Sequence, residues 1–144
     1  MYGWRPYLHA DETLNDSDKS ISVVSVPADL GAIEWQVQWI WVELTTTDDQ
    51  GDRQLVIEIQ DVATDVIGQI RAGVVQAASL TRYYMFSPQV AGMAAFIDTD
   101  FLTTPIPPFF LKQGDIIRIY DNNAVAVAAD DMIVQIQYAG RSVD

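Results

Sequence analysis

The sequence predicts an all-β protein, an antiparallel β-sandwich of about eight strands with an extended N-terminal arm. Apolar and polar residues alternate over several short runs, turn residues separate these runs, and no stretch sustains the 3.6-residue period of a helix. With 144 residues, of which 49% are hydrophobic, the chain has the size and composition of one domain with its own core. We therefore expect an arm over residues 1–20 and a single domain over residues 21–144.

The first twenty residues are polar and irregular, but they carry three large side chains, Trp4, Tyr7 and Leu8. Such a segment either folds back over its own domain or reaches a neighbouring subunit, since Trp and Tyr are enriched in protein interfaces. The first strand is predicted over Ile21–Val26, and Pro27 ends it because proline cannot continue a β-ladder.

The longest strand is predicted from Ile33 to Leu44, and its apolar face changes along its length. One face carries five apolar residues, and from Ile40 onwards the opposite face becomes apolar as well. The first set is Ile33, Trp35, Val37, Trp39 and Trp41, and the second is Ile40, Val42 and Leu44. This change predicts a β-bulge or a new environment for the strand. We expect the three Trp residues in the core and the second set on an outer face that another subunit covers.

Six further strands are predicted from short alternating runs between turns. They are Arg53–Gln60, Asp65–Ala72, Ser79–Phe86, an edge strand over Thr103–Leu111 that Pro105 limits, Ile117–Ile119 and Met132–Tyr138. Thr45–Asp52 is expected to be a hairpin loop, and Gln113–Asp115 a turn in which Gly114 can adopt a positive φ. The last strand alternates most cleanly, since Gln135 and Gln137 separate its apolar residues.

Charge excludes two classes of partner. The chain has 8 Lys and Arg against 20 Asp and Glu, a net charge of −12. Nucleic acids and anionic membrane surfaces both require clustered cations, so we expect neither as a partner. No apolar run approaches the roughly 18 residues of a membrane span. Because the mean hydropathy is +0.08 despite this charge, we expect some apolar surface to be buried between subunits.

The residues that usually carry catalysis or bind metals are scarce. There is no Cys, and the one imidazole, His9, cannot form a site with several His ligands. Asp48, Asp49 and Asp52 share one loop and Asp130–Asp131 precedes the last strand, but their spacing lacks the pattern of an EF-hand. We therefore predict no catalytic residue, no cofactor, no metal site and no enzyme activity.

The stretch Pro105–Tyr138 resembles the end of the small jelly-roll proteins of tailed-phage particles, in particular capsid decoration (cement) proteins. The resemblance lies in Pro-Pro-Phe-Phe-Leu-Lys-Gln-Gly-Asp-Ile-Ile-Arg-Ile-Tyr-Asp, a short Ala-rich loop, and Ala-Asp-Asp-Met-Ile-Val-Gln-Ile-Gln-Tyr. It implies a jelly-roll-like sandwich without enzyme activity. It also implies a homotrimer that binds the major capsid protein on the capsid surface of the virion and stabilises the shell.

Two other functions remain open. The chain could belong to the tail, neck or baseplate of a virion, or it could be a carbohydrate-binding module that uses Tyr83, Tyr84 and Trp4. For a partner or oligomer interface, we expect the apolar residues of the arm and of the long strand. These are Trp4, Tyr7, Leu8, Ile40, Val42 and Leu44.

Overall fold

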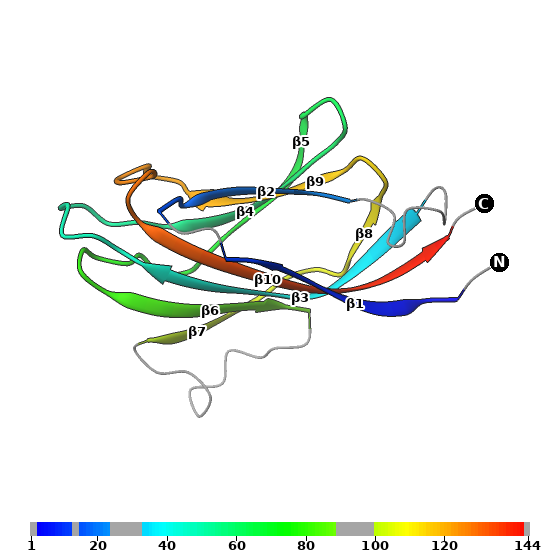
Figure 1. The fold of residues 1–144 in the computed structure, drawn as a ribbon, viewed down its shortest axis with the longest axis horizontal. Helices are drawn as coiled ribbons and strands as arrows, with labels where there is room; N and C mark the ends of the chain where they lie inside the picture. Colours follow the sequence, from blue (N-terminus) through cyan, green and yellow to red (C-terminus); the bar gives the residue numbers. More distant parts are fainter. Residues whose placement is uncertain (1–2, 13–14, 24–32, 89–99, 143–144) are drawn as a thin grey trace.

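The structure is a computed structural model that describes residues 3–12, 15–23, 33–88 and 100–142. In these residues the chain forms ten strands in two sheets that pack face to face (Figure 1). The larger sheet has the order β1 (Arg5–Asp11), β10 (Asp131–Ser142), β3 (Ile33–Thr45), β6 (Thr81–Ser87) and β7 (Phe101–Pro105), and β8 (Phe109–Lys112) also pairs with β3. The smaller sheet has the order β2 (Asp18–Ser22), β9 (Ile116–Asp121), β4 (Leu55–Gln60) and β5 (Val66–Arg71).

The predicted all-β sandwich is confirmed, and every pairing except one is antiparallel. The exception is β6 with β7, which run parallel. The structure has two strands more than the eight expected, because β1 forms within the expected arm and the predicted Thr103–Leu111 strand is two strands, β7 and β8. Pro107 and Pro108 separate them, since consecutive prolines supply no backbone N–H groups to a ladder.

Part of the expected N-terminal arm forms strands of the sandwich. β1 pairs antiparallel with β10, from Arg5 opposite Gly140 to Asp11 opposite Val134. β2 starts at Asp18 and pairs with β9. The arm therefore folds back on its own domain over these residues, which is one of the two alternatives that the sequence left open. Residues 24–26 of the predicted first strand lie outside the described residues.

The predicted bulge in the long strand is confirmed. The register of β3 against β10 shifts by one residue, because Trp39 lies opposite Gln137 and Val37 lies opposite Tyr138, which leaves Gln38 as the extra residue. A strand that gains one residue changes the side to which all following side chains point. Three apolar residues before the bulge and three after it therefore share the buried face. They are Ile33, Trp35 and Val37, then Ile40, Val42 and Leu44.

The bulge corrects two expectations. Ile40, Val42 and Leu44 are fully buried in the core and offer no surface to another subunit, so their prediction as interface residues was wrong. Trp35 is buried as expected, but Trp39 and Trp41 lie on the outer face and are only half-buried.

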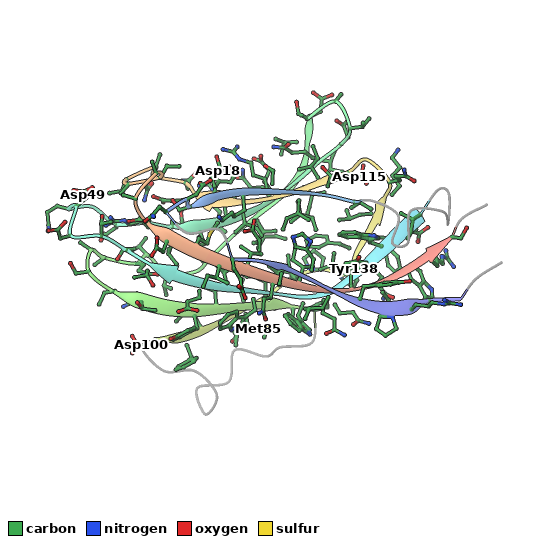
Figure 2. All side chains as sticks on the ribbon, in the orientation of Figure 1. Asp18, Asp49, Met85, Asp100, Asp115 and Tyr138 are labelled. Carbon is green, nitrogen blue, oxygen red and sulfur yellow. The ribbon has the colours of Figure 1, made fainter. Side chains whose placement is uncertain are left out.

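The core consists of the apolar residues on the two inner faces. Tyr138 lies between the sheets (Figure 2), where its ring stacks on Trp35 with the centroids 3.7 Å apart and on Tyr7 at 5.5 Å. Tyr7 therefore points into the molecule, although β1 is an edge strand. Aromatic packing of this kind fixes β1 and β10 to the rest of the core.

A buried ion pair closes the loop end of the sandwich. Arg53 and Asp130 are both fully buried, and the Arg53 Nε and Nη2 atoms donate to the Asp130 carboxylate at 2.9 and 3.1 Å. The Thr47 N–H donates to the same carboxylate at 2.9 Å. Arg53 Nη1 donates to the carbonyls of Asp49 and Gly51, each at 2.8 Å. The guanidinium thus joins the Asp130 carboxylate to two backbone carbonyls of the loop that contains Asp48, Asp49 and Asp52.

We predict that Arg53→Met destabilises the fold by about 3–5 kcal/mol, because it leaves the Asp130 carboxylate buried without its cation. Urea denaturation of the variant and the wild type measures the difference. Lys112→Met, which removes an exposed cation, is the matched control and should change stability by less than about 0.5 kcal/mol. Equal stability of the two variants would contradict a structural role for the ion pair.

We also predict that Leu44→Ala lowers the free energy of unfolding by about 2–5 kcal/mol, since it leaves a cavity in the core. Thr103→Ala, on the outer face of the same sheet, is the comparison and should cost much less. If urea denaturation showed only a small loss of unfolding free energy for Leu44→Ala, the burial of Leu44 in the core would be contradicted.

Candidate interaction surface

The outer face of the larger sheet carries apolar, aromatic and amide side chains and very little charge. Figure 2 shows Met85 on this face, which points away from the smaller sheet. The strand registers align its residues in three rows across the sheet. The rows are Ala10, Gln135, Trp41, Met85 and Thr103; Ile133, Glu43, Tyr83 and Phe101; and Leu8, Gln137 and Trp39. Glu43 is the one charged residue in these rows, and Asp131 lies in the next row, with Thr45 and Thr81. The whole chain has a net charge of −12. We call these three rows the outer face.

Three aromatic rings form a ladder across this face. Trp41 stacks on Tyr83 with the centroids 5.7 Å apart, and Tyr83 stacks on Phe101 at 4.7 Å. Neighbouring strands lie about 4.8 Å apart, so the rings stack along the sheet and turn their faces towards one another. Together with Met85 and two residues of β7 they line a hollow of about 250 Å³, and Phe101 is 51% exposed. The ladder thus presents a broad apolar surface without an open row of ring faces.

A second aromatic group extends the surface towards the N-terminus. Trp4 makes an edge contact with Phe110, with the centroids 6.2 Å apart, and the Arg141 guanidinium lies 4.5 Å from the centre of the Trp4 ring. Arg141 also forms an ion pair with Glu34 at 3.5 Å, so this group adds no net charge. Of the residues predicted for an interface, Trp4 and Leu8 are therefore on the surface. Tyr7, Ile40, Val42 and Leu44 point into the molecule.

The outer face of the smaller sheet carries a polar cluster instead. Arg118 donates two hydrogen bonds to the Asp18 carboxylate at 2.8 and 2.9 Å, lies 3.6 Å from a Glu58 oxygen and covers the Tyr120 ring at 4.0 Å. Burial raises the pKa of Tyr120, and the hydrogen bond to Glu58 raises it further. One guanidinium faces the two carboxylates of Asp18 and Glu58, so the cluster keeps a net negative charge.

Glu58 is the most enclosed acid of this cluster. Its carboxylate accepts hydrogen bonds from Gln60 at 2.6 Å, from Gln69 at 3.0 Å and from the Tyr120 hydroxyl at 3.1 Å. Burial by itself raises the pKa of Glu58, but these bonds and the charge of Arg118 outweigh it, so the pKa lies below its ordinary value. A general acid needs a raised pKa, so Glu58 is suited to a structural role.

The other candidates from the sequence are not brought together. His9 is half-buried in β1, away from the acidic loop of Asp48, Asp49 and Asp52. In the described ranges, no group of three His, Cys, Asp or Glu residues is placed to hold a metal ion. The same part of the chain contains no helix of the length and hydropathy that a membrane span requires.

Tyr84 does not belong to an exposed aromatic surface. It is buried, its hydroxyl donates to Gln76 Oε1 at 2.8 Å, and burial raises its pKa to about 12. The prediction that Tyr84 is an exposed carbohydrate-binding residue is therefore wrong. Trp4 is exposed and Tyr83 is half-buried.

Sequence reasoning missed Trp39, Trp41, Met85 and Phe101 as surface residues. For Trp39 and Trp41, the predicted bulge was the feature from which their outward orientation could have been inferred. If Gln38 is the extra residue, the alternation before it reverses after it, and Trp39 and Trp41 must then point outwards.

Comparisons with protein-family models and with curated proteins find no match for this chain. The chemistry of the outer face is therefore the main basis for a function.

We predict that the stabilising effect of Glu58 depends on pH. Because its pKa is lower in the folded chain than in the unfolded one, the ionised carboxylate stabilises the fold above the unfolded pKa of about 4.3. That contribution is lost as the pH falls through the folded pKa. Glu58→Gln should therefore reduce stability near neutral pH, and its difference from wild type should shrink in acid.

Urea denaturation at several pH values measures this difference. Glu43→Gln removes an acid from the outer face of the larger sheet and is the matched control. A Glu58→Gln effect that stays constant from neutral to acidic pH would contradict the role given to the ionised carboxylate.

Proposed function

We propose that this chain is a structural virion protein without enzyme activity, a capsid decoration (cement) protein of a tailed bacteriophage. In this proposal it forms a homotrimer, binds the major capsid protein on the outside of the head and stabilises the shell. The observation that carries the proposal is the outer face, an aromatic sheet surface with one charge on a chain of net charge −12. The resemblance of Pro105–Tyr138 to decoration proteins supports the phage context.

The composition of the outer face suits contact with protein. Interfaces are enriched in Trp, Tyr, Phe and Met and depleted in acidic residues at their centre. Trp41, Tyr83, Met85 and Phe101 form such a centre, and the amides of Gln135 and Gln137 can form hydrogen bonds beside it. Exposed apolar side chains gain about 1.5–3 kcal/mol each when they are fully buried. A large flat partner would therefore be bound firmly without any catalytic group.

The acidic charge of the rest of the surface gives this face selectivity. Copies of a chain with net charge −12 repel one another unless they meet where charge is sparse. A shell with a basic rim would be attracted at long range and would then contact the outer face. Another position on the particle, in the tail, neck or baseplate, would use the same chemistry, and imaging of labelled protein on particles distinguishes these sites.

A carbohydrate-binding module is the second candidate, because Phe101 and Trp4 are exposed aromatic residues and Tyr83 is half-buried beside Phe101. The geometry of the ladder counts against it. A sugar packs its C–H groups on the face of a ring, but the rings of Trp41, Tyr83 and Phe101 stack on one another. The ladder is therefore better suited to the varied side chains of a protein partner.

We predict that Phe101→Glu lowers the affinity for empty phage heads at least about tenfold, because it places a charge at the centre of the outer face. Co-sedimentation with heads measures the affinity. Val74→Glu, at a position that is 41% exposed outside this face, is the control with the same change of charge and should bind as wild type.

Equal binding of the two variants would contradict docking through the outer face. If Phe101→Glu instead abolished retention on a polysaccharide column, the carbohydrate-binding alternative would be favoured. Light scattering on the 16.0 kDa chain tests the trimer, and a strictly monomeric protein at micromolar concentration would contradict it. Point variants are preferable to deletion of residues 1–18, since that deletion removes β1 from the sheet.

A further inference from the structure

Strand β5 ends the smaller sheet with one edge unpaired. It pairs with β4 on one side, and no strand of the described residues pairs with its other side. The Ala72 N–H donates to the Leu55 carbonyl on β4 at 2.9 Å. Since an antiparallel ladder alternates with a period of two, the backbone groups of Gln69 and Arg71 point away from β4. The β4–β5 hairpin rises clear of the sandwich in Figure 1, so this edge is accessible.

Other edge strands carry residues that discourage further pairing, and β5 carries fewer. β1 contains Pro6, β7 ends at Pro105 and β2 begins with Asp18 and Lys19. Charges and prolines at such positions keep sheet edges from joining. β5 has no proline, and its one charged residue, Arg71, stands at its end. A one-residue register shift at Ile67 interrupts the ladder of β5 with β4 in its first part. There the Asp61 N–H donates to the Asp65 carbonyl at 3.0 Å, and the Asp65 N–H donates to Asp61 Oδ1 at 2.9 Å.

Apolar side chains are exposed along this strand and its hairpin. Val62, Val66 and Ile67 are 76%, 56% and 60% exposed. Val66 and Ile67 belong to the smaller sheet and Val62 to the turn before β5, whereas the aromatic ladder lies on the larger sheet. Pairing along β5 would cover Val66 and Ile67, which hydrophobic burial favours.

The sequence of this edge is complementary to itself when it is read antiparallel. Residues 65–71 read Asp-Val-Ile-Gly-Gln-Ile-Arg. With Gly68 opposite Gly68 of a second copy, Ile67 lies opposite Gln69 and Val66 opposite Ile70. Asp65 and Arg71 then meet through their side chains, since both backbone groups of Asp65 already bond to Asp61. The second half of the pairing repeats the first by symmetry. Two pairs of opposite charge thus flank an uncharged centre.

The charges of this edge are available for such pairing. Among the described residues, neither Asp65 nor Arg71 forms an ion pair, and both are exposed. The Arg71 guanidinium makes only long hydrogen bonds, of 3.3 and 3.4 Å, to Gln69. Opposite charges directly across an antiparallel pair stabilise it, whereas like charges destabilise it.

We propose that two copies of this chain pair antiparallel through β5, centred on Gly68, to form one continuous eight-stranded sheet with two-fold symmetry. The backbone of Gly68 points towards β4, so the Gly68 pair is of the kind without hydrogen bonds between its members. In such pairs the Cα atoms approach to about 4.5 Å, which glycine accommodates without a clash. This contact is independent of the proposed function, and it would join two trimers if the chain is trimeric.

A single cysteine tests the register. The chain has no Cys, and a Cβ at Gly68 meets no atom within 4 Å, so Gly68→Cys fits the fold. Two Cα atoms at about 4.5 Å are within the range of a disulfide. We expect Gly68→Cys to form a covalent dimer rapidly with oxidised glutathione, as seen on a non-reducing gel. Gly73→Cys also has open space but lies outside β5, and it should cross-link much more slowly.

Charge reversal provides a second test that does not depend on oxidation. Arg71→Asp and Asp65→Arg should each weaken pairing at least tenfold in sedimentation velocity, because each places like charges opposite one another. An equimolar mixture of the two variants should regain it, since each mixed pair has opposite charges at both ends. Lys112→Asp, the same change on β8, should leave pairing unchanged.

Equal cross-linking of the two cysteine variants would overturn the proposal, as would a mixture that stays unpaired. These outcomes are separate from those of head binding. Loss of β5 pairing with normal binding to heads would overturn this inference alone. Rapid cross-linking without binding to heads would overturn only the proposed function.

Discussion

The one-residue bulge at Gln38 determines which side chains of the central strand are buried. β3 has 13 residues and pairs with β10, β6 and β8, so its orientation sets the orientation of most of the larger sheet. Without the extra residue, Ile40, Val42 and Leu44 would point to solvent while Trp39 and Trp41 entered the core. The bulge therefore creates both the aliphatic core and the aromatic outer face.

Much of the fold could be predicted from the alternation of apolar and polar residues, because one face of each strand packs on the core and the other meets water. Met132–Tyr138 was predicted as a strand because its inner face meets the core and its outer face carries Gln135 and Gln137. β1 was harder to predict, since Tyr7 is its main contact with the core and His9 and Asp11 share its inner side. An edge strand with mixed polarity shows no clear period of two.

The surface could be predicted less well than the core. The sequence showed that the long strand changes face, but the position of the extra residue depends on the partner strand, where Gln137 and Tyr138 lie opposite Trp39 and Val37. The ladder of Trp41, Tyr83 and Phe101 also depends on a parallel pairing of β6 with β7 across residues 88–100, which no local pattern specifies. The contact between the two acidic loops likewise depends on Arg53, which follows Asp52 directly but lies 77 positions from Asp130.

The pairing of β1 with β10 brings the two ends of the chain side by side. Arg5 lies opposite Gly140, at the end of the larger sheet that is remote from the Arg53–Asp130 pair, and Figure 1 shows both termini on the same side of the molecule. A short linker could therefore join residues 142 and 3, and the exposed segment at Gly73 and Val74 could then supply new ends. The sandwich would then be a circularly permuted chain whose strands keep the same neighbours.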